Sequence, residues 1–173
     1  SVPAGTRSLL FRLTSPENKG MKLDDLFIVP CIPMKVNQQV EMTSSVYPVM
    51  VRIPCNPVLS LNVRTDGCLN PQFLTAVNLD FTGTTKLSDI ASVTVIRGEE
   101  EPLIHHGEEL FPKDSSQVLG TVKLAGSARP QISVKGNMEL EPGDNYLWAC
   151  VTMKEGASLD GRVVVRPASV VAG

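Results

Sequence analysis

The fold class is indicated by a short apolar run near the C-terminus, residues 145–152, with the sequence NYLWACVT. Every position from Tyr146 to Val151 is apolar or nearly so, which is typical of a central strand that is covered on both faces. We therefore expect Leu147 and Trp148 to be buried. The alternative, in which Trp148 is an exposed platform for a sugar ring, is less consistent with a run that is apolar on both sides.

Similar short apolar runs, many of them rich in β-branched residues, recur along the chain and are closed by turn residues. One helical turn is expected at Lys86–Ile90. The 13 Pro and 13 Gly residues are dispersed, which favours short strands over long helices. The pattern predicts an all-β fold, a β-sandwich with an extra N-terminal β-hairpin. The predicted strands are Ser8–Leu13, Leu26–Val29, Tyr47–Ile53, Val58–Val63, Leu74–Phe81, Ser92–Ile96, Val118–Leu124, Gln131–Val134, Asn145–Thr152 and Arg162–Val170.

Length and composition exclude several classes of protein. The 173 residues suffice for about one domain, and 42% of them are hydrophobic, so a packed core is expected. The 16 basic and 18 acidic residues alternate without a basic block, which argues against nucleic acid as a partner. No apolar run is long enough for membrane insertion, and no signal peptide is recognisable. Because the chain begins without Met, we expect a mature or excised piece.

The two ends of the chain resemble each other. Gly5–Thr14, followed by Leu23-Asp24 and Phe27–Val29, is similar to Gly143–Thr152, followed by Leu159-Asp160 and Val163–Val165. This similarity predicts residues 1–38 as the terminal hairpin of an upstream copy and residues 39–173 as one sandwich domain. The alternative is that the two hairpins merely share the same alternation, and residues 1–38 are extra strands of this domain. A detached hairpin needs an edge to pair with, so a strand-swapped or edge-paired dimer is expected.

Cysteine spacing gives little support for metal or redox chemistry. Cys31, Cys55, Cys68 and Cys150 form no C-x-x-C motif and have no nearby His. Cys31 and Cys150 lie in apolar runs, where a small buried thiol is the ordinary interpretation. A disulfide is the less favoured alternative, because the spacings resemble no small stapled scaffold.

No constellation of residues indicates an enzyme or a cofactor site. The only histidines, His105 and His106, are adjacent in a Glu-rich segment, where solvated side chains are more common than a metal site with Glu101 or Glu108. Carboxylates are abundant, but no pair is marked out as acid and nucleophile. No nucleotide-binding glycine motif is present. We therefore expect no catalytic residues, no metal and no cofactor.

Arginines offer a different kind of site. A guanidinium group can hold a ligand carboxylate through two parallel hydrogen bonds, so a sheet face that presents arginines could recognise an acidic sugar. Each of these arginines could equally be a solvated surface residue. The candidates, which lie in or near predicted strands, are Arg52, Arg64, Arg97, Arg129, Arg162 and Arg166.

Several segments carry a resemblance to a known family. Two of their motifs are moderately specific, Leu-x-Asp-Ile at residues 87–90 and Gly-x-Asn-Tyr-x-Trp at residues 143–148, and both mark structure rather than a site. Together the segments resemble the N-terminal domain associated with BNR-repeat neuraminidases (sialidases) of Bacteroidetes, over about residues 45–173. The segments are Tyr47–Val51, Asn56–Val63, Leu74–Phe81, Leu87–Val95, Leu140–Trp148 and Met153–Asp160.

The resemblance implies a non-catalytic β-sandwich with a jelly-roll-like topology that serves a secreted or surface glycoside hydrolase of the sialidase type. Its expected partners are host glycans, sialylated ones among them, and covalently linked catalytic or repeat domains. The expected location is secreted, periplasmic or on the outer-membrane surface. The alternative function is a structural or interaction module that spaces, docks or oligomerises a catalytic domain without binding sugar. The resemblance transfers no ligand-binding residue, so those positions are unknown.

Overall fold

The structure is a computed structural model that describes residues 32–44, 49–99, 117–124, 129–158 and 160–173. Contacts divide the chain into two units, Ser1–Pro30 and Cys31–Gly173, and every described residue belongs to the second. The strands expected at Ser8–Leu13 and Leu26–Val29, and with them the extra hairpin, lie outside the described residues.

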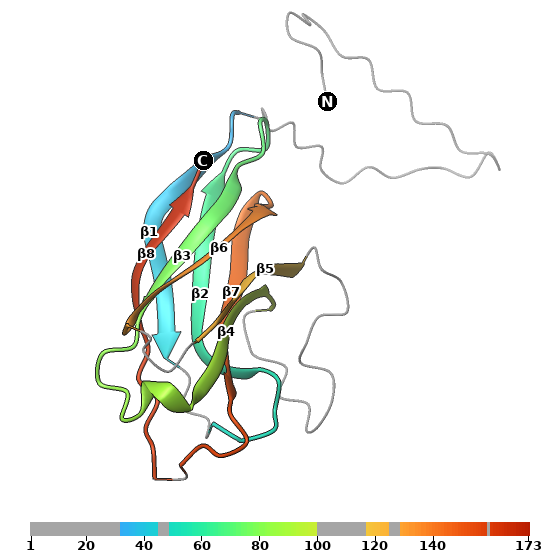
Figure 1. Cartoon of the computed structure of the whole chain (residues 1–173). Coiled ribbons are helices and arrows are strands. Elements are labelled where there is room, and N and C mark those ends of the chain that lie inside the picture. The colour runs from blue at the N-terminus through green and yellow to red at the C-terminus, as the bar shows by residue number, and fades with distance from the viewer. Residues whose placement is uncertain (1–31, 45–48, 100–116, 125–128, 159) are drawn as a thin grey trace, which may run out of the picture. The chain divides into compact units, whose positions relative to one another are not determined.

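Eight strands and one short 3-10 turn make up the described part of the chain (Figure 1). Strands are found in all seven regions from residue 56 onwards where the sequence predicts them, and the 3-10 turn replaces the expected helical turn. The elements are β1 (Lys35–Ser44), β2 (Asn56–Asp66), β3 (Phe73–Asp80), η1 (Leu87–Asp89), β4 (Ile90–Arg97), β5 (Val118–Lys123), β6 (Gln131–Glu139), β7 (Gly143–Met153) and β8 (Arg166–Ala172).

The strand predicted at Tyr47–Ile53 is wrong in its described part, and β1 was not predicted at all. Residues 49–53 form a loop in which Arg52 has a positive φ of 70°. The buried Asn56 holds this loop, because its Oδ1 accepts from Met50 N at 2.8 Å and its Nδ2 donates to Met50 O at 3.0 Å. The loop backbone therefore pairs with a side chain instead of a neighbouring strand.

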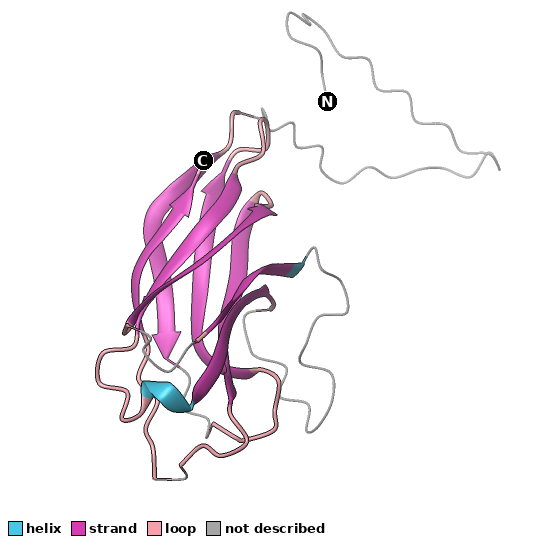
Figure 2. Ribbon diagram, in the orientation of Figure 1, coloured by secondary structure: helices cyan, strands magenta, loops and turns pink. Residues whose placement is uncertain are grey.

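The strands form two antiparallel sheets that make a β-sandwich (Figure 2). The five-stranded sheet has the order β1-β2-β7-β4-β5, and the three-stranded sheet has the order β6-β3-β8. As predicted from its two-sided apolar sequence, β7 is central in its sheet, between β2 and β4. The all-β sandwich class is thus confirmed.

One side of the sandwich is closed by a close approach of β5 and β6. A Cβ atom added at Gly136 would overlap the carbonyl oxygen of Leu119, and one added at Gly120 would overlap the carbonyl oxygen of Lys135. Only glycine allows the two backbones to come this close. The closure joins the β5 edge of the larger sheet to the β6 edge of the smaller one.

The main core lies between the two sheets and takes alternate residues from each strand. From β7 it includes Leu147, Ala149 and Val151, and from β3 it includes Val77 and Leu79. Trp148 points to the other side of β7 and belongs to a smaller cluster with Ile96, Cys55 and Cys150. Leu147 and Trp148 are both buried, as predicted, with 0% and 7% of their surface exposed.

The C-terminal half of the internal similarity is not a hairpin. Its first strand, β7, belongs to the five-stranded sheet, whereas β8 pairs with β3 in the other sheet. Val163–Val165 forms an extended connection in which Val164 N donates to Thr84 Oγ1 and Val164 O accepts from the same hydroxyl. The expected boundary between residues 38 and 39 falls inside β1, and Met34 before it is buried in the main core.

The cysteine prediction requires a correction. Cys150 is not a buried thiol, because it forms a disulfide with Cys55 across 95 residues of sequence, and Cys68 is disulfide-bonded as well. Cys55 immediately precedes β2, and the register of β2 on β7 pairs Pro57 with Cys150. The strand pairing brings the two sulfur atoms together, and sequence spacing does not reveal that pairing.

Candidate functional site

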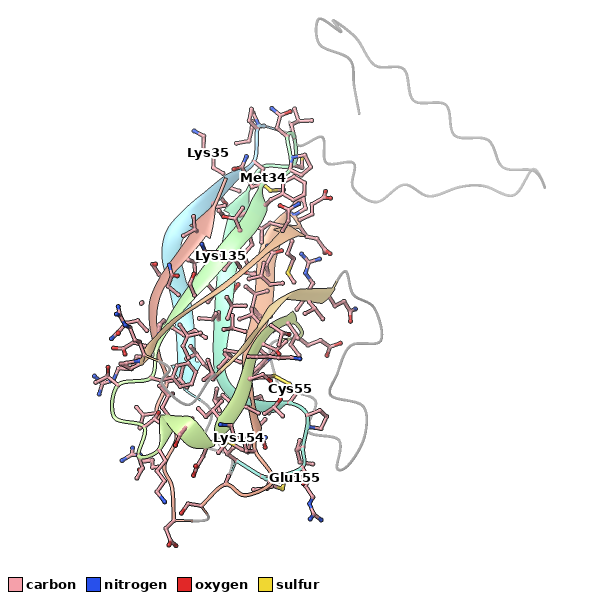
Figure 3. The ribbon with its side chains drawn as sticks, in the orientation of Figure 1. Met34, Lys35, Cys55, Lys135, Lys154 and Glu155 are labelled. Atoms are coloured by element: carbon pink, nitrogen blue, oxygen red, sulfur yellow. A yellow bond between two sulfur atoms is a disulfide. The ribbon has the colours of Figure 1, made fainter. Side chains whose placement is uncertain are left out.

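The outer face of the three-stranded sheet carries a regular set of polar side chains, which we call the polar face. Its three rows follow from the strand register, because partners on β6, β3 and β8 lie side by side. The rows are Lys135-Ala76-Val171, Ser133-Asn78-Ser169 and Gln131-Asp80-Arg166. Figure 3 labels Lys135 on this sheet.

Strand alternation places these side chains on the outside. Ile132, Val134, Val77 and Leu79 are buried in the core between the sheets, and the residues between them are turned to solvent. The register of β3 on β8 shifts at two bulges, one between Leu74 and Ala76 and one between Asn78 and Leu79. The residues of the three rows remain paired across these bulges. The apolar positions that build the core therefore also fix which polar residues share the outer face.

Hydrogen bonds order part of the polar face. Asn78 Nδ2 donates to Ser169 Oγ at 2.8 Å, which links the middle row across β3 and β8. In the last row, Asp80 Oδ1 accepts from Thr82 N at 2.9 Å, from Thr82 Oγ1 at 2.6 Å and from Gln131 Nε2 at 3.4 Å. Asp80 is thus held in place by its neighbours.

The same contacts set the charge of Asp80. The hydrogen bonds from the Thr82 side chain and backbone lower the pKa of the Asp80 carboxyl below its ordinary value, and nearby Arg166 lowers it further. Asp80 is therefore ionised at neutral pH. Among the described residues, the one ion pair joins Arg97 Nη1 and Glu141 Oε1 at 2.8 Å, so Arg166 and Asp80 are neighbours without a direct ion pair.

The arginines singled out in the sequence divide into two groups. Arg129, Arg162 and Arg166 come to the same end of the three-stranded sheet. Arg129 lies two residues before Gln131, Arg166 is the partner of Asp80, and Arg162 O accepts from Thr85 N in the loop after β3. The others lie elsewhere: Arg52 is in the loop before β2, Arg64 is exposed on β2, and Arg97 is paired with Glu141.

Trp148 is a packing residue and not an exposed platform. A Cβ atom added at Gly98 would lie 2.6 Å from Trp148 Cδ1, so the indole ring sits directly on the backbone of that glycine. The indole Nε1 donates to Glu99 O at 3.0 Å. The protein therefore covers the apolar surface of the ring and provides a hydrogen-bond acceptor for its Nε1–H group.

The Gly-x-Asn-Tyr-x-Trp motif has a structural role, in agreement with the sequence analysis. Gly143 has a φ of 97°, a conformation that L side chains rarely adopt, and it starts β7. Asn145 is buried; its Oδ1 accepts from Glu141 N at 2.8 Å, and its Nδ2 donates to Val63 O at 3.1 Å. The motif fastens the β6–β7 turn to β2.

The metal site and the membrane span considered from the sequence concern residues only partly described by the structure. His105, His106, Glu101 and Glu108 lie outside them, so the suggested metal pairing has no structural account. No group of three or more His, Cys, Asp or Glu residues suited to a metal ion occurs in the part of the chain that is described. That part also contains no helix long and apolar enough to cross a membrane.

Sequence reasoning did not single out most of the polar face. Arg166 was among the candidate arginines, but Asp80 was not distinguished from the other carboxylates, and Asn78, Ser133 and Ser169 were not considered. The signal was the polar residue at every second position of Val77–Asp80 and Gln131–Val134. That alternation shows which residues face outward, but not which strands lie side by side.

Three comparisons with known proteins bear on this fold. The model of the family described as "N-terminal domain of BNR-repeat neuraminidase" matches residues 37–173. Among solved structures, the chain is similar to the "Hadza microbial sialidase Hz136", with a TM-score of 0.57 and 18% sequence identity over 76% of this chain. The chain spans 28% of that sialidase's length. A comparison with curated proteins found no significant match.

Proposed function

Because the chain belongs to the family of N-terminal domains of BNR-repeat neuraminidases, we propose that it is a non-catalytic glycan-binding module of a sialidase-type glycoside hydrolase. Its partners are host glycans, sialylated ones among them, and the catalytic or repeat domains linked to it. The observation that carries the glycan proposal is the polar face, which presents amide, hydroxyl, ammonium and guanidinium groups on one ordered sheet.

Those groups match the needs of a sugar ligand. Sugar hydroxyls both donate and accept hydrogen bonds, and Asn78, Ser133 and Ser169 offer both functions within one row. The Trp148 ring is buried, so recognition at this face relies on hydrogen bonds and charge instead of that ring. Recognition of this kind suits a polar or acidic sugar better than an apolar ligand.

The absence of catalysis is also part of the proposal. Glycoside hydrolysis generally needs a carboxylic acid with a raised pKa beside a second carboxylate. The carboxyl of Asp80 on the polar face has its pKa lowered instead, so it does not supply the acid. We expect no turnover of an aryl sialoside by the purified chain. Turnover that a single carboxylate substitution abolished would contradict this part of the proposal.

The disulfides support a location outside the reducing cytoplasm. Cys55–Cys150 is a disulfide, Cys68 is also disulfide-bonded, and none of the cysteines within the described residues is free. Disulfides persist mainly in secreted, periplasmic and cell-surface proteins. We therefore propose one of those compartments as the location, and trapping of free thiols in extracts of the native source tests this proposal.

A second function, docking against a linked domain, is favoured by one observation. Ile32 and Leu69 are exposed by 52% and 40%, and they lie close together because Leu69 N donates to Ile32 O at 3.1 Å. Gly173 pairs with Phe73 near the same end of the sandwich. Exposed apolar residues that lie together are suited to an interface with another domain.

A glycan array with the isolated chain distinguishes the two functions. Binding to a defined set of glycans supports the binding module. If no glycan binds, and Leu69→Ser weakens the association with the linked catalytic domain, the docking function stands in its place. Arg64→Gln serves as a control for the loss of an exposed surface side chain, because Arg64 is exposed on β2 and its substitution leaves Ile32 and Leu69 unchanged.

A further inference from the structure

The row Gln131-Asp80-Arg166 and its flank carry an excess of positive charge in a chain whose net charge is −2. Lys135 and Arg166 lie on the polar face, and Arg129 precedes β6 at the end where Arg166 begins β8. The one carboxylate in these three rows is Asp80. A local excess of cations on an acidic protein complements an anionic ligand.

Asp80 does not neutralise Arg166 by contact. Its Oδ1 already accepts from Thr82 and Gln131, and it makes no ion pair with Arg166 within the described part of the chain. The exposed guanidinium of Arg166 therefore keeps its forked set of donors for an external partner. A carboxylate, like a phosphate, is a group that this fork fits through two parallel hydrogen bonds, and among these it is the carboxylate that acidic sugars carry.

The three rows together cover an area large enough for a small saccharide. Adjacent strands are about 4.8 Å apart and alternate residues about 7 Å apart, so the three rows cover about 10 Å by 14 Å. Ser133, Asn78 and Ser169 form the row beside Arg166 and offer partners for hydroxyl groups. In the Lys135-Ala76-Val171 row, the small, buried side chain of Ala76 lies between Lys135 and Val171.

We infer that the polar face is a binding site for the carboxylate of an acidic sugar, with Arg166 holding the carboxylate and the Ser133-Asn78-Ser169 row holding ring or side-chain hydroxyls. The inference rests on the proposed glycan-binding function and deepens it by naming the site and the chemical class. Two kinds of sugar carry such a carboxylate, a terminal sialic acid and a uronic acid, and the chemistry at Arg166 is shared by both.

The test compares variants by calorimetric titration with three probes: sialyllactose, a glucuronate-terminated oligosaccharide and neutral lactose. The full chain is used as Arg166→Gln, which removes the charge, and as Arg166→Lys, which keeps the charge but loses the fork. Arg64→Gln is the matched control, because it also removes an exposed strand arginine but lies on the other sheet. Unchanged melting temperatures verify that each variant is folded.

The expected result is that one acidic probe binds the wild type and Arg64→Gln equally. Arg166→Gln should weaken that binding about ten- to hundredfold, the effect of losing a charge-assisted hydrogen-bond pair. Arg166→Lys should recover only part of the loss. Asp80→Asn, which keeps an acceptor oxygen for Thr82 while removing the nearby negative charge, should tighten binding a few-fold.

Which acidic probe binds identifies the source of the carboxylate, and either one supports the inference. Binding that Arg166→Gln leaves unchanged but Arg64→Gln abolishes would move the site to the five-stranded sheet; the proposed function would stand and this inference would fail. Lactose binding as tight as that of the acidic probes would overturn carboxylate recognition alone. If the wild type binds none of the probes and no glycan on the array, both the proposed function and the inference fail.

Discussion

Replacing Trp148 with alanine is the sharpest test of the packing on the outer side of β7. The indole ring lies on the Gly98 backbone and joins Ile96 and the Cys55–Cys150 disulfide in the smaller apolar cluster. Only 7% of its surface is exposed. Truncation therefore leaves a cavity over the centre of the five-stranded sheet, which the rigid strand backbone fills only in part.

The expected loss is about 3–5 kcal/mol of unfolding free energy, which is typical of a buried aromatic residue replaced by alanine. About 1 kcal/mol of this belongs to the hydrogen bond from Nε1 to Glu99 O. Trp148→Phe keeps most of the ring's apolar area and loses that bond, so it should cost roughly 1–2 kcal/mol. The two variants together separate packing from hydrogen bonding.

Urea denaturation followed by circular dichroism is the appropriate assay, because the chain has a single Trp and its fluorescence disappears with the substitution. Leu147→Ala is the matched control: the residue is adjacent, faces the main core and should lose about 2–5 kcal/mol. The reasoning is refuted if Trp148→Ala keeps the wild-type urea midpoint. If that variant also loses a glycan ligand, the ring is an exposed binding platform.

Four further predictions follow from individual contacts. Replacing both Cys55 and Cys150 by alanine should lower the free energy of unfolding by up to about 4.7 kcal/mol, the chain-entropy value for a loop of this length. A reductant should lower the melting temperature of the wild type more than that of the variant, because the variant lacks this bond. Asn145→Ala should lower the free energy of unfolding by about 1–3 kcal/mol, because Glu141 N and Val63 O lose their buried partner. A urea midpoint equal to that of the wild type would contradict this prediction. Asp80 has a folded-state pKa below its unfolded value of about 3.9, so its stabilising effect is present above that pH and is lost as the pH falls through the folded pKa. The difference in melting temperature between the wild type and Asp80→Asn should therefore shrink towards pH 2. A difference that stays constant with pH would contradict this prediction. Deleting residues 1–30 keeps Met34 and β1. A stable monomer after this deletion would support a separate leading hairpin, whereas an insoluble product would assign those residues to this domain. Size-exclusion chromatography of the full chain tests the expected strand-swapped or edge-paired dimer.

The strands that the sequence predicted well are those whose own alternation or apolarity reflects burial. β7 is apolar at nearly every position because both of its faces are covered, and β3 alternates because only one face is. β1 was missed because Lys35–Ser44 contains few apolar residues and lies at the edge of its sheet, where it pairs with β2 alone. An edge strand is defined by its neighbour's backbone, and its own sequence needs little hydrophobicity.

The run at Tyr47–Ile53 shows the opposite error. It is apolar enough to suggest a strand, but in its described part the buried Asn56 side chain hydrogen-bonds to the backbone of Met50. Competition between a side-chain amide and a neighbouring strand depends on tertiary position, which periodicity does not contain. The Cys55–Cys150 disulfide escaped prediction for the same reason, because the residues are 95 positions apart and meet only through the β2–β7 register.

The candidate site was predictable only as a list of residue types. Arg129, Arg162 and Arg166 were recognised as possible carboxylate ligands together with Arg52, Arg64 and Arg97, and sequence offered no means of separating the two groups. The separation comes from the order β6-β3-β8, which joins segments about 50 to 90 residues apart. A site built across three strands requires their register, and register is set by the packed core on the opposite face.

The family motif and the candidate site occupy different parts of the molecule, and this separation bears on specificity. Gly143, Asn145 and Trp148 fix the start of β7 and its packing in the five-stranded sheet. The polar face lies on the other sheet, where substitutions such as Arg166→Gln change the charge without touching the core. Chains that share the motif can therefore share the scaffold while presenting different outer faces. Membership of the family identifies the sandwich, and the ligand has to be established from the side chains around Asp80 and Arg166 in each chain.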